Sequence, residues 1–485
     1  MELVEVLSER TFYDRLPRRG EWLVSYLRHR LQNVLVLAAS DMIAIVLAFL
    51  LAGSIRLFWQ GALLIPDWAW YLIPAWWIGT AITQLLPSWG LGPVEELRRT
   101  VLLLIVIFAG AAVVLFISKA SESVSRITLT LSFLFSVVTV PFMRMLVKHL
   151  LIRLGVWGLP TVIYGGGEFA ERIVRFLQAE KGLGYKPIGI FDDDPSSWNT
   201  ALLNVPIEGG TNLVTPEASV AILAMPSMSS ARATELLEGP LSYYRTVLLV
   251  PDLLESPSLW VKPRDLSGML GLEITSNLIN PVSRFAKLTF DVLVVLLTSP
   301  IWFPICATLA FLIWFEDRQS PFFLQERVGR GGKMFRTFKF RTMVPNAEAV
   351  LRQKLETDEV MRTEWETFYK LRKDPRITKI GRLLRRLSLD ELPQLINVLR
   401  GEMSLVGPRP LPTYHCNELP RRVRELRERV RPGITGLWQV SGRSDTGNEG
   451  MEQWDPYYVR NWSLWLDAVI LVRTITAVLK GSGAY

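Results

Sequence analysis

Residues Phe290–Phe315 form a long apolar stretch, FDVLVVLLTSPIWFPICATLAFLIWF. It is long enough to cross a bilayer, since a spanning helix takes about 20 apolar residues. However, Pro300 and Pro304 near its middle each remove a backbone hydrogen bond and cost a straight helix about 3 kcal/mol. The stretch therefore predicts a re-entrant helix-break-helix over 284–316, in which the Ser299 hydroxyl satisfies a carbonyl freed at the break. A kinked transmembrane helix remains the alternative.

The charges on both sides of this stretch favour re-entry. Arg284 and Lys287 precede it, and a basic run that begins at Arg318 follows it. A spanning helix would place one of these clusters on the outer side, against the positive-inside rule. Asp291 lies four residues after Lys287, so an ion pair between them is the simplest role for that acid.

Four further apolar segments, each close to the length of a transmembrane helix, lie near the N-terminus. They cover roughly residues 34–57, 68–86, 101–118 and 127–147. Basic residues are most frequent before the first segment, between the second and third, and after the fourth. This pattern predicts a four-helix bundle, residues 1–157, with both ends in the cytoplasm. Asp41 lies inside the first segment, where a carboxylate costs about 2.5–3.5 kcal/mol; a pair within the bundle and a separate role both remain open for it.

The composition agrees with a membrane protein that faces the cytoplasm. Of 485 residues, 49% are hydrophobic, and the mean hydropathy is +0.25. The net charge of +8 is compatible with nucleic acid, anionic lipid headgroups or phosphate-bearing substrates, and with apolar runs this long the membrane surface explains most of it more simply. The sequence has two cysteines, Cys306 and Cys416, and three scattered histidines, so neither a disulfide framework nor a zinc site is predicted. The N-terminal arm lacks the pattern of a signal peptide.

Short apolar strands alternate with amphipathic segments over residues 158–252, which predicts a small Rossmann-like βαβ domain. Gly165 and Gly167 fit a G-x-G-x-x-G/A turn after the first strand, and Asp192 follows the second strand, where a ribose-binding acid would lie. Tight βα turns also need glycine without a ligand, and Glu168 would repel a phosphate. A nucleotide site and a structural or regulatory domain therefore both remain open.

Residues 387–395 read LSLDELPQL and place two acids, Asp390 and Glu391, side by side. Ser388 and Glu391 have capping-box spacing, and in another frame Asp390 is itself the N-cap, so both acids are expected in the first turn of a helix. Arginines flank them: Arg382, Arg385, Arg386 and Arg409. Ionised carboxylates among arginines suit phosphoryl transfer, with one acid as nucleophile or metal ligand. A capped helix with surface ion pairs is the alternative.

The sequence from Arg284 to Tyr485 resembles the catalytic domain of the bacterial monotopic phosphoglycosyl transferases, also called bacterial sugar transferases. The matching stretches are QERVGRGGKMFRTFKFRTM, DPRITKIGRLLRRLSLDELPQLINVLRGEMSLVGPRP, RPGITGLWQVSGRSD and YYVRNWSLWLDAVILVRT. The resemblance extends more loosely to the large members of that family over the whole chain. It implies a linker at 253–283 and a mainly α-helical (α+β) monotopic catalytic domain at 317–485, after the re-entrant helix.

This resemblance implies transfer of a hexose 1-phosphate from a UDP-hexose to undecaprenyl phosphate at the cytoplasmic face of the bacterial inner membrane, which releases UMP. It implies Asp390 as the nucleophile, Glu391 as the second acid, and Mg²⁺, with Mn²⁺ as an alternative, held by both. It also implies contacts to the phosphates or the donor from these positions: Lys339, Arg341, Arg382, Arg385, Arg409, Arg443 and Asp467. Ser299-Pro300 matches the family's helix break, and a homodimer is compatible with the resemblance.

Two segments depart from the family pattern. RQSPFFLQ follows the re-entrant helix where the family usually has a Gly-Pro turn, and TGNEGMEQW replaces the usual acidic helix, which leaves the choice of sugar open. Two rival functions would make different demands on the same residues. A membrane-anchored NAD-dependent sugar-nucleotide dehydratase would need a Tyr-x-x-x-Lys pair; Tyr369 and Lys373 have that spacing but no second glycine turn precedes them. A non-catalytic scaffold would need no acid pair beside a proline-flanked arginine.

Overall fold

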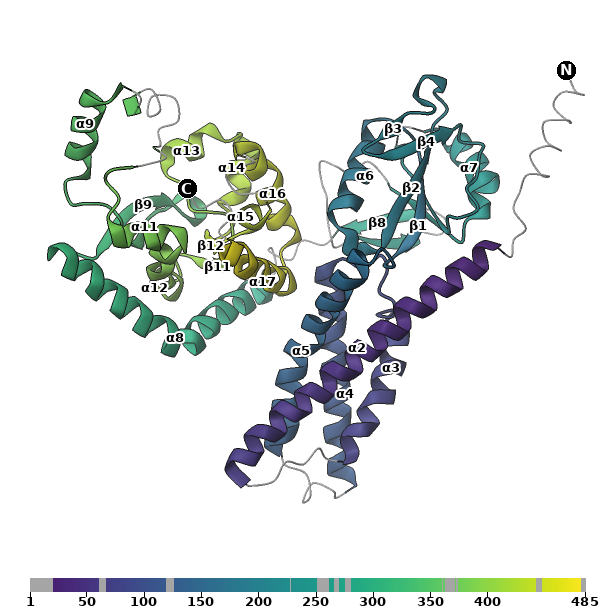
Figure 1. The fold of residues 1–485 in the computed structure, drawn as a ribbon, viewed down its shortest axis with the longest axis horizontal. Helices are drawn as coiled ribbons and strands as arrows, with labels where there is room; N and C mark the ends of the chain where they lie inside the picture. Colours follow the sequence, from purple (N-terminus) through teal and green to yellow (C-terminus); the bar gives the residue numbers. More distant parts are fainter. Residues whose placement is uncertain are drawn as a thin grey trace, which may run out of the picture. The chain divides into compact units, whose positions relative to one another are not determined.

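The computed structural model describes residues 21–60, 67–118, 126–226, 228–250, 261–265, 270–274, 281–359, 361–362, 371, 374–441 and 447–480. The chain divides into two compact units, Met1–Leu253 and Leu254–Tyr485. Unit 1 contains apolar helices followed by a mixed sheet, and unit 2 contains a long apolar helix followed by a mainly helical domain (Figure 1). The predicted succession of fold types along the chain is thus confirmed at this level.

The apolar helices of unit 1 are α2 (Glu21–Gln60), the 3₁₀ helix η1 (Asp67–Tyr71), α3 (Leu72–Ile82), α4 (Pro93–Ile117) and α5 (Arg126–Arg153). Three of them, α2, α4 and α5, contain stretches long and apolar enough to cross a bilayer. Helix α3 has 11 residues, a rise of about 17 Å, so the second predicted segment is shorter than the sequence suggested. The helix ends early because Thr83 caps it and Gln84 has a positive φ of 57°.

Helices α2 and α5 contact each other, and several of their buried positions hold small side chains. Ala44 and Ala48 on α2, and Ser132 and Ser136 on α5, are fully buried. Small residues at such spacing let two apolar helices approach closely. The Thr139 hydroxyl donates to the Ala44 carbonyl at 3.0 Å, which adds a polar contact between the two helices.

A buried cluster of charges joins three helices of this bundle. Arg144 on α5 donates to both carboxylate oxygens of Asp41 on α2, at 2.7 and 2.5 Å, and Trp76 Nε1 donates to Asp41 Oδ2 at 2.9 Å. Glu96 on α4 accepts from Lys148 at 2.5 Å and from Arg144 at 3.4 Å. Two acids and two bases therefore balance inside the bundle. Asp41 takes the first of the two roles left open for it, a pair within the bundle.

A mixed six-stranded sheet completes unit 1, in the order β3-β4-β2-β1-β5-β6. The strands are β1 (Leu159–Tyr164), β2 (Tyr185–Phe191), β3 (Ala201–Leu202), β4 (Val205–Gly209), β5 (Val220–Leu223) and β6 (Thr246–Leu249). All neighbours are parallel except β3 and β4. The intervening helices are α6 (Glu168–Ala179), η3 (Lys181–Leu183), η4 (Pro195–Ser197), α7 (Ser230–Glu238) and η5 (Pro240–Tyr243). Parallel neighbours need such crossovers, which explains the alternation seen in the sequence.

Unit 2 begins with an antiparallel hairpin, β7 (Val261–Asp265) and β8 (Leu270–Ile274), which lies inside the region 253–283 predicted as a linker. Helix α8 (Pro281–Asp317) and a second hairpin, β9 (Phe322–Val328) and β10 (Met334–Phe340), follow. The remaining elements are α9 (Ala347–Thr357), α11 (Lys379–Arg386), η8 (Leu389–Gln394), α12 (Leu395–Leu399), β11 (Ser404–Val406), α13 (Thr413–Glu418), α14 (Arg421–Arg427), β12 (Gly433–Thr435), α15 (Leu437–Val440), α16 (Gly447–Asn461) and α17 (Leu464–Lys480), besides the short η7 (Arg330–Gly332) in the second hairpin.

Helix α8 is continuous, with Pro300 and Pro304 inside it. Figure 1 shows it bent into two arms, called here the first and the second arm in the order of the chain. The Ser299 hydroxyl donates to the Leu296 carbonyl at 2.7 Å, and this is the carbonyl that Pro300, which has no N–H, leaves without its helical donor. The Ser299 hydroxyl thus bonds to a carbonyl freed by a proline, and the helix continues through the position where a break was expected.

The second arm of α8 lies beneath the segment that carries the acid pair. Ile313 on α8 forms a buried apolar cluster with Phe340 on β10 and Leu384 on α11, and Leu389 and Leu392 of η8 pack against it. The acid-bearing 3₁₀ helix is thus supported directly by the apolar helix. This packing fixes the position of Asp390 and Glu391 relative to α8.

Candidate active site

Asp390 and Glu391 lie in the first turn of η8, a 3₁₀ helix rather than the expected start of an α-helix. Ser388 precedes it with φ 53° and makes no capping hydrogen bond, so neither predicted capping arrangement forms. The capping box is absent because the Glu391 side chain is bonded elsewhere. It reaches two basic groups from distant parts of the chain.

Glu391 is paired with two cations at one carboxylate oxygen. Lys339 Nζ on β10 donates to Glu391 Oε1 at 2.8 Å, and Arg409 Nη2 donates to the same oxygen at 2.9 Å. Burial alone would raise the pKa of Glu391, but the charges of Arg409 and Lys339 outweigh it and hold the pKa at about 2. Glu391 is therefore ionised at neutral pH, and its charge is matched by the two basic side chains.

The environment of Asp390 pushes its pKa in the opposite direction. Burial and the neighbouring charge of Glu391 raise the pKa of Asp390, and Lys339 and Arg385 oppose this only in part. Across the described residues, no other side chain donates a hydrogen bond to this carboxylate. Two adjacent acids whose pKa values are pushed apart are a common sign of different chemical roles.

A cleft of about 1190 Å³ opens over both acids. Five basic residues line it: Lys339, Arg341, Arg376, Arg385 and Arg409. Further lining comes from aromatic side chains, Phe323, Phe340 and Trp438, and from hydroxyl and amide side chains, Thr342, Thr435, Gln439 and Thr474. A cleft with an excess of positive charge concentrates anionic ligands such as phosphates.

Local packing places Arg385 of α11 at the cleft. Arg385 Nε donates to the Thr342 hydroxyl at 2.9 Å. Gly381 allows this approach, since a Cβ there would lie 2.1 Å from the Thr342 carbonyl oxygen. The Thr378 hydroxyl accepts from the Gly381 N–H at 2.9 Å and caps the helix. Arg385 is therefore held against the cleft wall by its own helix.

The other predicted site residues are distributed unevenly. Arg341 lines the cleft while bonded to the Asp317 carboxylate and to the Ser320 carbonyl at 2.8 Å. Arg382 is exposed on α11 and is not among the lining residues. Arg443, and the Tyr369 and Lys373 of the rival dehydratase interpretation, lie outside the described residues.

Asp467 is fully buried on α17 and does not line the cleft. Its carboxylate accepts from Lys287 Nζ at 2.7 Å, Tyr458 Oη at 2.8 Å and Trp462 Nε1 at 3.0 Å. Lys287 lies closer to Asp467 than to its predicted partner Asp291, which is at 3.8 Å. Asp467 thus joins α17 to the first arm of α8, an arrangement that its position in the sequence did not indicate.

Asn397 is a residue of this region that the sequence reasoning missed. It is fully buried on α12, where its side chain accepts from the Phe338 N–H at 3.0 Å and donates to the Arg336 carbonyl at 2.8 Å. These bonds tie β10, and with it Lys339, to the helix that follows the acid pair. The signal in the sequence was a single asparagine within the apolar run QLINVL.

The glycine turn of unit 1 is filled by the protein itself. The Asp192 carboxylate accepts from the Gly166 N–H. Gly165 has φ +117°, and a Cβ there would lie 2.7 Å from the Ala224 carbonyl oxygen, whereas Gly167 has no atom within 4 Å of such a Cβ. Gly165 is therefore required by close packing, and the turn amide that could receive a phosphate already binds a carboxylate.

Asp390 and Glu391 could hold a magnesium ion together with groups of a bound substrate. No group of three or more histidine, cysteine, aspartate and glutamate side chains that could hold a metal occurs in the described part of the chain. Mg²⁺ is commonly bound by one or two carboxylates together with substrate phosphates and water, not by an all-protein cage. Two adjacent carboxylates in a basic cleft, Asp390 and Glu391, provide that donor set.

Comparisons with known proteins indicate the family of the chain. A family model described as bacterial sugar transferase matches residues 282–481. The chain is 38% identical over 401 residues to the UDP-galactose-lipid carrier transferase of Erwinia amylovora, covering 81% of this chain and 82% of the relative. It is 37% identical over 410 residues to the undecaprenyl-phosphate galactose phosphotransferase of Salmonella typhimurium, with the same coverage. The UDP-glucose:undecaprenyl-phosphate glucose-1-phosphate transferase of Escherichia coli is 34% identical over 54% of this chain and 55% of its own length.

The apolar helices, the basic cleft over an acid pair and these matches define a membrane-associated transferase. The chain belongs to the bacterial sugar transferase family. A second family model, described as a CoA-binding domain, matches residues 87–220. The glycine turn in that region does not fit a phosphate-bearing group, because Asp192 binds the Gly166 amide and Glu168 follows at the start of α6.

Proposed function

We propose that this transferase moves a hexose 1-phosphate from a UDP-hexose to undecaprenyl phosphate, which yields undecaprenyl-diphospho-hexose and UMP. The observation that carries the proposal is the pair Asp390 and Glu391 in a cleft lined by five basic residues. The names of the relatives, which include a galactose and a glucose phosphotransferase acting with undecaprenyl phosphate, support the same substrates. The reaction would be the first membrane step in the synthesis of O-antigen, capsule or exopolysaccharide.

The reaction would proceed in two displacements at one phosphorus atom. In the first, an oxygen of the Asp390 carboxylate attacks the sugar-bearing phosphorus, and the bond to the bridging oxygen breaks to release UMP. In the second, a phosphate oxygen of undecaprenyl phosphate attacks the same phosphorus, forms the diphosphate and releases the Asp390 carboxylate. The covalent phosphosugar-aspartate exists only between the two steps.

The basic residues have separate tasks in this scheme. Lys339 and Arg409 keep Glu391 ionised and would contact the substrate phosphates, and Arg385 lies near Asp390. Fixed cations at this place stabilise charge that develops on the transferred phosphoryl oxygens. Mg²⁺, when bound by Asp390 and Glu391, would neutralise phosphate charge and orient the transferred group.

We further infer that α8 re-enters the membrane and that the cleft faces the cytoplasm. Only 6% of the apolar window of α8 is buried within the protein, so most of its surface suits lipid. In unit 1, η1 has 5 residues and α3 has 11. Their combined rise is about 27 Å. This length is close to the ~30 Å thickness of the hydrocarbon core, so the two helices together could cross it. Four crossings of the bundle would return the chain to the cytoplasm, where UDP-sugars are found.

The sheet of unit 1 would form a Rossmann-like structural or regulatory domain. Its central parallel strands carry crossover helices of the Rossmann type, and the occupied turn amide argues against a dinucleotide. An assembly of two copies is consistent with this proposal.

The function is tested by incubating the purified protein with a panel of UDP-hexoses, undecaprenyl phosphate and Mg²⁺ while UMP is measured. We expect UMP release with at least one UDP-hexose and formation of a lipid-linked sugar. Absence of UMP with every donor, from protein that is folded by circular dichroism, would overturn the proposal.

The topology is tested by single cysteines at Arg284 and Ser320 in a background that lacks Cys306 and Cys416. Re-entry predicts that both react with a membrane-impermeant thiol reagent from the cytoplasmic side alone. Labelling of Ser320→Cys from the outer side would show that α8 spans the membrane, and the proposed location of the cleft would then be wrong.

A further inference from the structure

The main chain that carries Arg409 is fixed by four hydrogen bonds to other segments. Each of residues 407–409, and residue 411, has a backbone group in a hydrogen bond with another segment of unit 2. Three of these bonds join backbone groups: Gly407 N–H to the Thr435 carbonyl at 2.9 Å, Gly433 N–H to the Pro408 carbonyl at 2.9 Å, and Val328 N–H to the Leu411 carbonyl at 3.0 Å. The fourth involves a side chain and lies at Arg409 itself.

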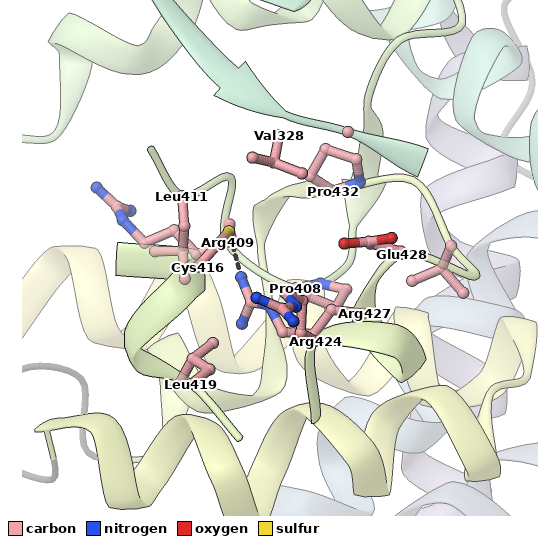
Figure 2. Close-up of a pocket in the computed structure, with 12 residues that line it drawn as sticks. Val328, Pro408, Arg409, Leu411, Cys416, Leu419, Arg424, Arg427, Glu428 and Pro432 are labelled. Atoms are coloured by element: carbon pink, nitrogen blue, oxygen red, sulfur yellow. Dashed lines mark hydrogen bonds between the residues drawn. The ribbon is translucent and has the colours of Figure 1, made fainter. Parts of the chain in front are cut away.

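Arg427 supplies that fourth bond. Its Nη2 donates to the Arg409 carbonyl oxygen at 2.5 Å, the bond drawn as a dashed line in Figure 2. Pro408 and Pro410 flank Arg409, so neither of those neighbours has an N–H to form a local turn. The guanidinium of Arg427 is therefore the group that anchors the Arg409 peptide unit.

Asp455 holds Arg427 in place. Arg427 Nη1 forms an ion pair with Asp455 Oδ2, and only 8% and 2% of the two side chains are exposed. Arg427 is the last residue of α14 and Asp455 lies in α16, so the pair also joins two helices. A buried arginine that makes two directed bonds through its rigid fork is a geometric constraint, since lysine has no second nitrogen to reproduce it.

The cavity beside this pair is too small to bind a substrate. It measures about 20 Å³ and is lined by Arg409, Arg427, Glu428 and apolar side chains including Leu411 and Cys416 (Figure 2). A space of this size accommodates one water molecule. Arg427 is not among the residues that line the large cleft, whereas Arg409 is, so Arg427 reaches the site through Arg409.

We propose that Arg427, held by Asp455, is a positioning residue that fixes the Arg409 main chain and so directs the Arg409 guanidinium onto Glu391. This inference rests on the proposed function for its kinetic consequences. Loss of the Arg427 bond would leave the Arg409 side chain in place but imprecisely oriented. A misplacement of about 1 Å at a phosphate-binding cation can lower turnover about 100-fold.

The test is a double-mutant cycle between Arg427→Met and Arg409→Ala, measured as kcat/KM for UMP release. If Arg427 acts through Arg409, each single variant loses about 100-fold, and the double variant loses no more than about threefold beyond the worse single variant, because coupled residues are not additive. Arg424→Met is the matched control, since Arg424 lies on the same helix and lines the same cavity but bonds to Asn417. It should combine additively with Arg409→Ala.

A second measurement does not depend on substrate. Hydrogen–deuterium exchange of the segment 404–411 should be faster in Arg427→Met than in the unmodified protein, and unchanged in Arg424→Met. Arg427→Lys, which keeps a cation for Asp455, should show the same faster exchange if Arg427→Met does not fold.

The outcomes separate this inference from the proposed function. Unmodified protein that releases no UMP contradicts the function, while faster exchange at 404–411 still supports the positioning role. Additive kinetics in the cycle, or unchanged exchange in both Arg427 variants, would overturn the positioning role even if UMP is released.

Discussion

Two of the groups of buried or half-buried charges in the described part of the protein are built differently. In the bundle of unit 1, Asp41, Arg144, Glu96 and Lys148 form a neutral set in which every charge has an opposite partner within 3.4 Å. At the cleft of unit 2, Glu391 takes two cations at one oxygen, while Asp390 receives no hydrogen bond from any other described side chain. The first group is sealed by helices, and the second opens to a large cleft.

This difference distinguishes charges that stabilise the fold, in unit 1, from charges that are available for chemistry, at the cleft of unit 2. A buried ion pair that is complete resists change, because removal of one member leaves an uncompensated charge. A carboxylate that is only partly compensated has a shifted pKa and remains available to a ligand. The comparison therefore predicts a loss of activity from changes at the cleft and a loss of stability from changes in the bundle.

The largest effect is expected for Asp390→Asn. An amide cannot attack phosphorus, so UMP release should fall about 10⁴-fold or more, with an unchanged circular dichroism spectrum. Glu425→Gln, in an exposed pair with Arg421, is the control and should retain full activity. Near-normal turnover in Asp390→Asn would remove the nucleophile assignment.

In the bundle, Arg144→Met should destabilise the folded state by about 3–5 kcal/mol, because Asp41 is left buried without its main partner. The measurement is the thermal midpoint in detergent together with UMP release per folded molecule. The double variant Asp41→Leu/Arg144→Met should recover much of the stability. If activity per folded molecule fell in the rescued double variant, the charges of unit 1 would affect the chemistry as well as the stability. The proposed difference from the charges at the cleft would then be wrong.

A pH measurement sharpens the comparison at the cleft. Burial and the charge of Glu391 raise the pKa of Asp390. As the pH falls, Asp390 therefore becomes protonated at a higher pH than an ordinary aspartate does. Glu391→Gln removes that charge and should lower the pKa of Asp390. The acidic limb of kcat/KM should then shift to lower pH, even though the maximal rate decreases about 100-fold. An unshifted limb would show that Asp390 does not control it.

The smallest effects are expected in the sheet of unit 1. Gly165→Ala should destabilise unit 1 by about 1–3 kcal/mol, because φ is positive and a Cβ would meet the Ala224 carbonyl. Gly167→Ala, with open space around the new Cβ, should be neutral in stability. Neither change, nor Asp192→Ala, should alter UMP release per folded molecule. Loss of activity that added nucleotide restores would show instead that the turn is a ligand site.

The sequence predicted the parts of the molecule that depend on local pattern. Apolar runs located α2, α4, α5 and α8, and the proline pair with Ser299 located the bend. Local pattern failed at Ser388 and Glu391, where capping spacing was present but Lys339, 52 residues away, attracts the Glu391 side chain. The family resemblance assigned Asp467 to the donor region. Its hydrogen-bond partners on α8 and α16 are brought to it by tertiary packing, which the spacing of residues in the sequence cannot reveal.

The contact between Lys287 and Asp467 can form only late in the biosynthesis of the protein. The two residues are 180 positions apart, and ribosomes add about 5–20 residues per second. For roughly 10–40 seconds, the first arm of α8 exists while the helix that carries its carboxylate partner has not been synthesised. Chains that stop before α17 would leave Lys287 without that carboxylate, with Asp291 at 3.8 Å as its remaining acidic partner.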